Sequence, residues 1–98
     1  MKRIVEVHYF VKSGCRAEFF RQINEKGISA AARAETGNEK YDYFFSPIDP
    51  DELILLEVWS SPEAVQSHME TDHYRKLIEL KKEFVVETTF SRYDAEQV

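Results

Sequence analysis

Two histidines in the second half of the chain, His68 and His73, are the residues best suited to proton transfer or metal binding. Imidazole titrates near neutral pH and can act as an acid, a base or a metal ligand. A spacing of five residues places two side chains about 140° apart on a continuous helix, whereas a two-histidine metal site needs a spacing of four. The spacing alone therefore favours structural roles, with His68 at a helix–sheet interface and His73 at a turn, and no metal site. A break at Thr71-Asp72 would instead turn both imidazoles toward one cavity.

Three other side chains could carry chemistry, but each has a simpler structural explanation. His8 lies in the middle of a predicted strand and is expected at a seam between subunits. Glu57 is the acidic residue of an otherwise apolar strand, so we expect it to form a structural ion pair, with Arg92 as a candidate partner. Cys15 is the only cysteine, which excludes an internal disulfide and a thiolate zinc site. No glycine-rich phosphate loop, serine elbow or Cys-x-x-Cys pair is present.

Strands are predicted from alternating apolar residues over residues 2–12, 41–47, 53–59 and 84–93. In the first, Val5, Val7 and Tyr9 share one face. The third strand is apolar on both faces, which is typical of a central strand that is covered on two sides. One cover is the protein's own helices, and the other must be something else.

Two helical segments separate these strands. The first is predicted from Ala17 as one helix of about five turns, with Gly27 as a tolerated interior glycine and Gly37 as its C-terminal stop. The second begins with Ser61 as N-cap and Pro62 at the first helical position. Thr71 offers a second N-cap within that segment.

The element order β-α-β-β-α-β predicts an α+β fold of the ferredoxin-like type, with a four-stranded antiparallel sheet and both helices on one face. Residues 1–98 are expected to form a single domain. The opposite sheet face carries apolar side chains, from which we expect a homodimer through the sheets.

Composition limits the class of function. The chain holds 18 acidic and 13 basic residues, for a net charge of -5, and such a surface repels nucleic acid. No stretch is long enough to span a membrane, and the N-terminal residues lack a signal-peptide core, so a cytoplasmic location is expected. Aromatic residues make up 13% of the chain. An apolar, aromatic pocket would suit a planar hydrophobic or small carbonyl substrate.

Several segments together resemble the antibiotic biosynthesis monooxygenase (ABM) domain family. They are a Gly-Asn turn that leads into a tyrosine strand, a Glu-x-Trp strand end, a Glu-Ala helix with a histidine, and a second histidine followed by an aromatic residue. In this chain they are residues 35–42, 56–59, 62–68 and 71–74.

The resemblance implies a dimeric α+β barrel with a cavity between sheet and helices in each subunit. Several family members oxidise anthrones, quinols or other aromatic compounds with dioxygen and without cofactors. The resemblance then implies His68 or His73 as the proton acceptor and Trp59 and Tyr74 as pocket walls, and we add Val7 and Tyr9 to the substrate-binding residues.

Two branches of the family can be compared with this chain. The haem-degrading branch needs an asparagine, a tryptophan and an axial histidine where this chain has Val7, His68 and Ile78, so no haem is expected. A branch that isomerises an autoinducer sugar phosphate resembles residues 37–42, 63–68 and 71–75. It tends to carry tyrosine at the position of Trp59, and it needs a cluster of basic residues at the pocket mouth.

Three hypotheses remain open at this point. The first is a cofactor-independent monooxygenase that acts on a quinol/anthrone-like small molecule. The second is the sugar-phosphate isomerase, and the third is a non-catalytic binding protein of the same fold. The third predicts a pocket that is filled by the protein's own side chains.

Overall fold

The computed structural model describes residues 1–98 and contains four strands and four helices. In chain order they are β1 (Lys2–Val11), α1 (Arg16–Glu25), α2 (Ile28–Arg33), β2 (Asn38–Phe45), β3 (Glu52–Trp59), α3 (Pro62–His68), α4 (Asp72–Phe84) and β4 (Val85–Ala95). Each predicted helical segment is a pair of helices. The α+β prediction is confirmed, with the simple βαββαβ order expanded to β-α-α-β-β-α-α-β.

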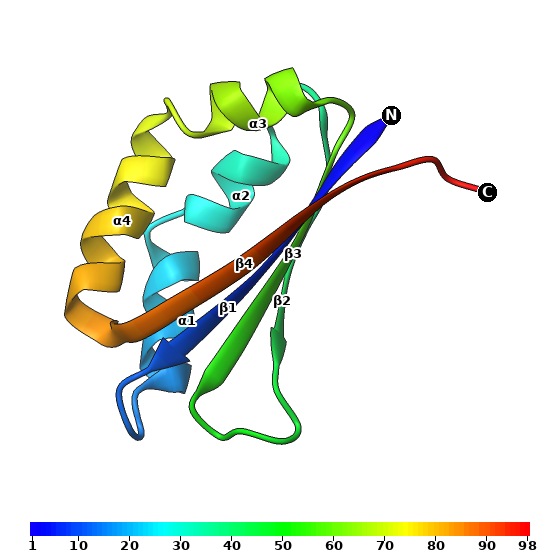
Figure 1. Ribbon diagram of the computed structural model, residues 1–98. Coiled ribbons are helices and arrows are strands. Elements are labelled where there is room, and N and C mark those ends of the chain that lie inside the picture. Colours follow the sequence, from blue (N-terminus) through cyan, green and yellow to red (C-terminus); the bar gives the residue numbers. More distant parts are fainter.

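The strands form one antiparallel sheet in the order β2-β3-β1-β4. Figure 1 shows all four helices on the same side of this sheet. This is the ferredoxin-like arrangement that the sequence predicts. Because β1 and β3 are the central strands, their helix-facing side chains form the surface of the sheet on which the helices pack.

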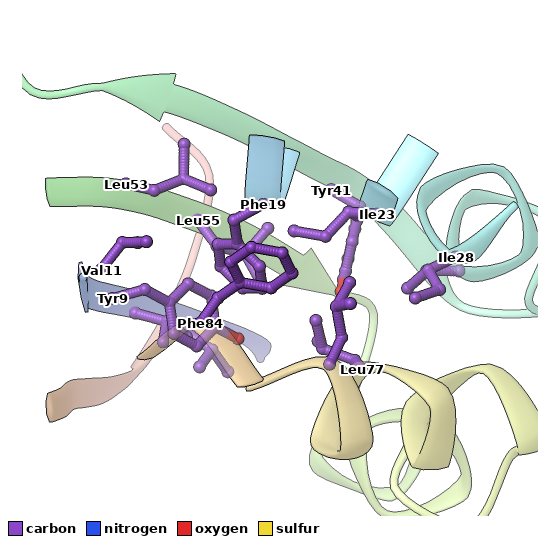
Figure 2. Close-up of a cluster of buried hydrophobic side chains, with 14 of the residues drawn as sticks. Tyr9, Val11, Phe19, Ile23, Ile28, Tyr41, Leu53, Leu55, Leu77 and Phe84 are labelled. Carbon is purple, nitrogen blue, oxygen red and sulfur yellow. The ribbon is translucent and has the colours of Figure 1, made fainter. Parts of the chain in front are cut away.

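Strand parity separates the two faces of the sheet. Val5, Val7 and Tyr9 of β1 are buried beneath the helices, as are Leu53 and Leu55 of β3. Phe19 of α1 and Phe84 of α4 close this core from above, with ring centroids 5.7 Å apart, as the close-up of the core shows (Figure 2).

The expected single helix from Ala17 is wrong, because Gly27 divides it. Gly27 has φ +72°, a left-handed conformation that an L-residue adopts at a cost, and it separates α1 from α2. The segment therefore bends, and Ile28 and Ala32 of α2 are buried. Phe84, predicted to begin the last strand, instead ends α4.

Gly37 has a different role from the predicted helix stop, since α2 ends at Arg33. It occupies the turn before β2 with φ +91°. A Cβ atom there would lie 2.8 Å from Cβ of Ala64 and 2.9 Å from Oγ of Ser60. Glycine thus lets the turn after α2 approach the start of α3 closely.

The predicted caps of the second segment are confirmed. The hydroxyl of Ser61 accepts a hydrogen bond from the backbone N–H of Ala64, with Pro62 at the start of α3. Thr71 caps α4 in the same way through the N–H of Tyr74. The chain therefore changes direction between α3 and α4.

The face of the sheet away from the helices carries a band of apolar side chains on its central strands. From β1 and β3 these are Ile4, Phe10, Ile54, Leu56 and Val58, and all are partly buried. Phe44 of β2 and Tyr93 of β4 extend the band and are about half exposed, at 47% and 55%. No helix of the structure has the length and apolar character needed to cross a membrane.

Candidate active site

A cavity of about 290 Å³ lies between the sheet and helices α3 and α4. Nine of its 14 lining residues are hydrophobic. Side chains from all four strands and from both helices contribute to the lining, among them Val7, Tyr9, Tyr41, Glu57, His68 and Tyr74. An apolar cavity of about 150 Å³ holds one benzene ring, so this cavity has room for a small aromatic molecule.

The polar centre beside this cavity is a carboxylate that is shared by two imidazoles. Glu35 follows α2 in the turn before β2, and its Oε2 accepts hydrogen bonds from Nδ1 of His68 at 2.5 Å and from Nε2 of His73 at 2.7 Å. Thr71 links the two histidines, since its hydroxyl donates to the carbonyl of His68 and it caps the helix that carries His73. The change of direction between α3 and α4 therefore brings together two imidazoles that their spacing would separate.

The hydrogen bond to Glu35 fixes how His68 faces the cavity. With Nδ1 donating to the carboxylate, Nε2 of a neutral ring carries the lone pair. Nε2 forms no hydrogen bond within the chain. The polar side-chain atoms that are both inaccessible to solvent and without a partner belong to Ser29, Tyr41 and Tyr43, so Nε2 of His68 keeps some accessible surface. His68 lines the cavity, so this nitrogen is reached from there. Burial, together with the neighbouring His73, lowers the pKa of His68 despite the opposing effect of Glu35, which favours the neutral, proton-accepting ring at neutral pH.

Trp59 lies behind His68 and does not line the cavity. It is fully buried, and its ring centroid lies 4.8 Å from that of the imidazole. Its indole Nε1 donates to Oε1 of Glu57 at 2.9 Å. Trp59 therefore supports one cavity-lining side chain by packing and another by a hydrogen bond.

Glu57 is not ion-paired, contrary to the expectation from the sequence. Glu57 is 7% exposed, and the one hydrogen bond of its carboxyl group is the one from Trp59. Arg92 also lines the cavity but forms no ion pair with it. The pKa of Glu57 is raised to about 7, chiefly by burial and in part by the negative charge of Glu35, while the indole N–H of Trp59 opposes the rise. A carboxyl group in this state can hold a proton near neutral pH.

Tyr9, Tyr41 and Tyr74 contribute aromatic rings to the lining. The hydroxyl of Tyr41 is buried without a hydrogen-bond partner, and the Tyr41 ring lies 5.8 Å from that of His68. Burial raises the pKa values of Tyr41 and Tyr9 above the usual range, so both stay protonated at neutral pH. Tyr41 therefore contributes its ring to the cavity lining, while its hydroxyl is sealed within the fold.

Glu35, His68 and His73 are also the residues that could hold a metal ion, since one ligand atom from each lies within 4.8 Å of the others. Two ligand atoms on a zinc ion with bonds of about 2.0–2.1 Å lie roughly 3.3 Å apart. The contacts of 2.5 and 2.7 Å to one carboxylate oxygen are shorter than that. The arrangement is that of a hydrogen-bonded triad, and an ion would have to push the three groups apart.

Two cations, Lys81 and Arg92, stand at separate positions on the cavity lining. The ammonium of Lys81 lies 5.3 Å from the ring centroid of Tyr9, and the guanidinium of Arg92 lies 5.3 Å from that of Phe90. Arg92 pairs with Val5 on β1, four residues from Tyr9. Lys81 comes from α4 and Arg92 from β4, and the two cations contact different rings of the lining.

Comparison with known proteins shows the family to which the chain belongs. The sequence model named Antibiotic biosynthesis monooxygenase matches residues 3–80. The chain belongs to the antibiotic biosynthesis monooxygenase family. The predicted membership is therefore confirmed over most of the chain.

Individual relatives agree with this membership. "Putative monooxygenase YcnE" of Bacillus subtilis is 28% identical over 82 residues, which are 84% of this chain and 84% of YcnE. The structure of Rv0793 from Mycobacterium tuberculosis superposes with a TM-score of 0.86 at 20% identity, covering 100% of this chain and 98% of Rv0793. PA3566 from Pseudomonas aeruginosa gives a TM-score of 0.85 at 17% identity over 98% of this chain and 95% of its own. At these identities the structural likeness shows the shared fold.

The structure of this family member divides the predicted site residues into two groups. Four of them line the cavity, namely Val7, Tyr9, His68 and Tyr74. The other two, Trp59 and His73, stand behind it and contact His68 or its partner Glu35.

Sequence reasoning missed Glu35 and Tyr41 and gave Glu57 only a structural role. The position of Glu35 depends on the turn after α2 and on the close approach at Gly37, which no local pattern reveals. Tyr41 begins the strand predicted over residues 41–47, and in the structure it lines the cavity. The signal available for Glu57 was its place in a Glu-x-Trp strand end, two residues from Trp59 and on the same face.

Proposed function

We propose that this protein is a cofactor-independent monooxygenase acting on a quinol/anthrone-like aromatic small molecule. The observation that carries the proposal is His68, whose Nδ1 is held by Glu35 while Nε2 faces an aromatic cavity. Membership in the monooxygenase family supports the reaction class. The volume of about 290 Å³ is close to twice that of a cavity for one benzene ring. It therefore favours substrates of two fused rings within this class.

The proposed reaction balances without an external reductant. Substrate and dioxygen combine, one oxygen atom enters the ring system, and the other leaves as water with two hydrogen atoms of the substrate. His68 takes a proton from the substrate, which makes the ring electron-rich enough to reduce dioxygen itself. The protein orients the substrate and keeps water out of the cavity.

The cavity also bears on the other two hypotheses. A non-catalytic protein with a self-filled pocket would lack such a cavity. The isomerase needs a basic cluster for its phosphate, and Lys81 and Arg92 contact different rings of the lining. Both observations favour the oxygenation reaction.

We further propose that the protein is a homodimer that associates through the apolar band on the outer face of the sheet. The band includes Leu56 and Ile54, which no helix covers. An uncovered apolar face of this kind is typical of an association surface. In such a dimer the sheet of the second subunit would cover the outer face of β3, whose apolar side chains the helices of the first subunit do not reach.

The monooxygenase proposal is tested by oxygen uptake. Metal-free protein is mixed with hydroquinone, naphthalene-1,4-diol or anthrone, and oxygen consumption and formation of the oxygenated product are compared with autoxidation. Oxidation of a quinol to its plain quinone would release hydrogen peroxide, so the products that mark oxygenation are the hydroxyquinone of each quinol and anthraquinone from anthrone. We expect naphthalene-1,4-diol to be oxygenated fastest, with water rather than hydrogen peroxide as the second product. His68→Gln should lower kcat by about 10²–10⁴-fold, the usual contribution of a general base.

His8→Gln is the matched control, because His8 lies on the other face of the sheet and bonds to Glu6 and Glu52. It should retain wild-type turnover. Rates equal to autoxidation for all three compounds would overturn the proposed function. Full activity of His68→Gln would overturn the assignment of the base.

A further inference from the structure

We propose that Glu57 is the proton donor of the reaction, delivering a proton from the cavity wall to the oxygen atom that leaves as water. This inference rests on the proposed function and adds a second proton-transfer group to it. It is argued from the position of the carboxyl group, from its partners and from what the reaction requires.

The position of Glu57 directs one oxygen into the cavity. Glu57 lines the cavity, and its Oε1 accepts a hydrogen bond from the indole N–H of Trp59 at 2.9 Å. The other oxygen, Oε2, forms no hydrogen bond within the chain. It also keeps some accessible surface, because it is not one of the buried polar atoms that lack a partner. A buried residue whose free oxygen is still accessible must expose that oxygen to the cavity it lines.

The surroundings of Glu57 contain no cation close enough to hold it as a carboxylate. The groups that act on its pKa are the indole of Trp59 and the carboxylate of Glu35, besides burial. The titratable and charged groups on the elements around it are Tyr9 of β1, Tyr41 and Tyr43 of β2, His68 of α3, Tyr74 and Lys81 of α4, Arg92 of β4, and Glu35. Burial thus keeps a proton on Glu57 near neutral pH, while it keeps His68 neutral.

The reaction needs both groups. His68 first takes a proton from the substrate, and the resulting carbanion forms a carbon–oxygen bond to dioxygen. The peroxide anion takes the proton back from His68. In the next step His68 removes the remaining C–H proton, whose electron pair forms the new C=O bond as the O–O bond breaks. The departing hydroxide takes the proton of Glu57 and leaves as water.

The cycle closes when the proton on His68 returns to Glu57 through the cavity. The sum is one substrate and one dioxygen converted to one oxidised product and one water. Without a donor, hydroxide would have to leave into an apolar cavity, which is unfavourable for a charged group. A neutral carboxylic acid on the cavity wall removes that charge as it forms.

The variant that tests this role is Glu57→Gln in the full-length protein. The amide oxygen can still accept the indole N–H, so packing is retained, but the side chain cannot transfer a proton. We expect kcat at pH 6 to fall by at least 100-fold, with KM changed less than twofold. In the wild type kcat should fall about tenfold per pH unit above pH 7, and this limb should be absent in the variant. Glu79→Gln, an exposed change on α4, should leave the profile unchanged.

A second readout needs no substrate. Trp59 is the only tryptophan, so its fluorescence reports the protonation of the carboxyl group to which it donates. We expect a transition near pH 7 in the wild type that is absent in Glu57→Gln. In Trp59→Phe the hydrogen bond that lowers the pKa of Glu57 is lost, so the alkaline limb of kcat should move to higher pH.

These outcomes separate the inference from the proposed function. Turnover of the wild type with unchanged kcat and pH profile in Glu57→Gln would overturn the role of Glu57 and leave the monooxygenase intact. Absence of the fluorescence transition would overturn it as well. Absence of wild-type turnover above autoxidation would overturn the proposed function itself.

Discussion

At the scale of single residues, the site consists of ordinary side chains whose properties are set by burial. His68 and Glu57 have opposite intrinsic preferences at neutral pH, since a free imidazole is partly protonated and a free carboxyl group is ionised. Burial disfavours the charged form of each and moves both toward neutrality. The cavity therefore holds an acceptor and a donor without a net charge between them.

The raised pKa of Glu57 has a consequence for folding. The native state holds a proton that the unfolded chain releases above about pH 4.5, so this group's contribution to stability falls as the pH rises from 4.5 to about 7. A pKa change of that size corresponds to on the order of 3 kcal/mol. Glu57→Gln lacks this cost, so its stability relative to the wild type should increase by a few kcal/mol between pH 4.5 and pH 8.

Urea unfolding of both proteins at the two pH values, at one fixed protein concentration, measures this difference. Equal changes in the free energy of unfolding for the two proteins would show that Glu57 titrates normally in the native state.

At the scale of elements, the site depends on two places where the chain changes direction. The break between α3 and α4 brings His68 and His73 to one carboxylate. The tight turn at Gly37 allows the segment that carries Glu35 to approach α3. If α3 and α4 formed one continuous helix, His68 and His73 would point in different directions and could not both reach Glu35.

Gly37→Ala should therefore destabilise the protein more than the same change at Gly27. Both glycines have positive φ, but a Cβ at Gly27 meets nothing within 4 Å, whereas one at Gly37 would overlap Ala64 and Ser60. The left-handed conformation costs each variant about 1–2 kcal/mol, and the overlap adds a further cost of about 1–3 kcal/mol at Gly37. Thermal or urea unfolding of the two variants checks this, and equal losses would contradict the role of the close approach.

At the scale of the whole molecule, the sheet has two apolar faces with different uses. The helix-facing side forms the core and the cavity, whereas the outer face carries the apolar band of β1 and β3. A stable interface between two subunits covers about 800 Å² on each. The outer face of a four-stranded sheet is a surface of suitable shape for this.

Leu56→Lys should convert the proposed dimer to a monomer, because it places a charge in the middle of the band. Ile48→Lys is the matched control, since Ile48 is 92% exposed in the loop between β2 and β3. Sedimentation equilibrium should give a dimer for the wild type and for Ile48→Lys. A dimeric Leu56→Lys variant, or a monomeric wild type, would contradict association through this face.

The amino-acid sequence by itself determined the strands, the fold class, the family and four of the cavity-lining residues. Alternation of apolar residues and cap residues such as Ser61 and Thr71 are local signals, and local signals survive without tertiary structure. The helix break at Gly27 was missed because an interior glycine costs a helix only about 1 kcal/mol and is often tolerated.

Only the tertiary structure decided how these residues act together. The contact of Glu35 with His68 and His73 joins positions that are 33 and 38 residues apart, and no spacing rule connects them. The same holds for Glu57, whose lack of an ionic partner and raised pKa depend on what the folded chain places around it. Residue types and periodicity can be read from short stretches of sequence. Burial and long-range contacts exist only once the chain has folded, and burial and these contacts decided the chemistry of this site.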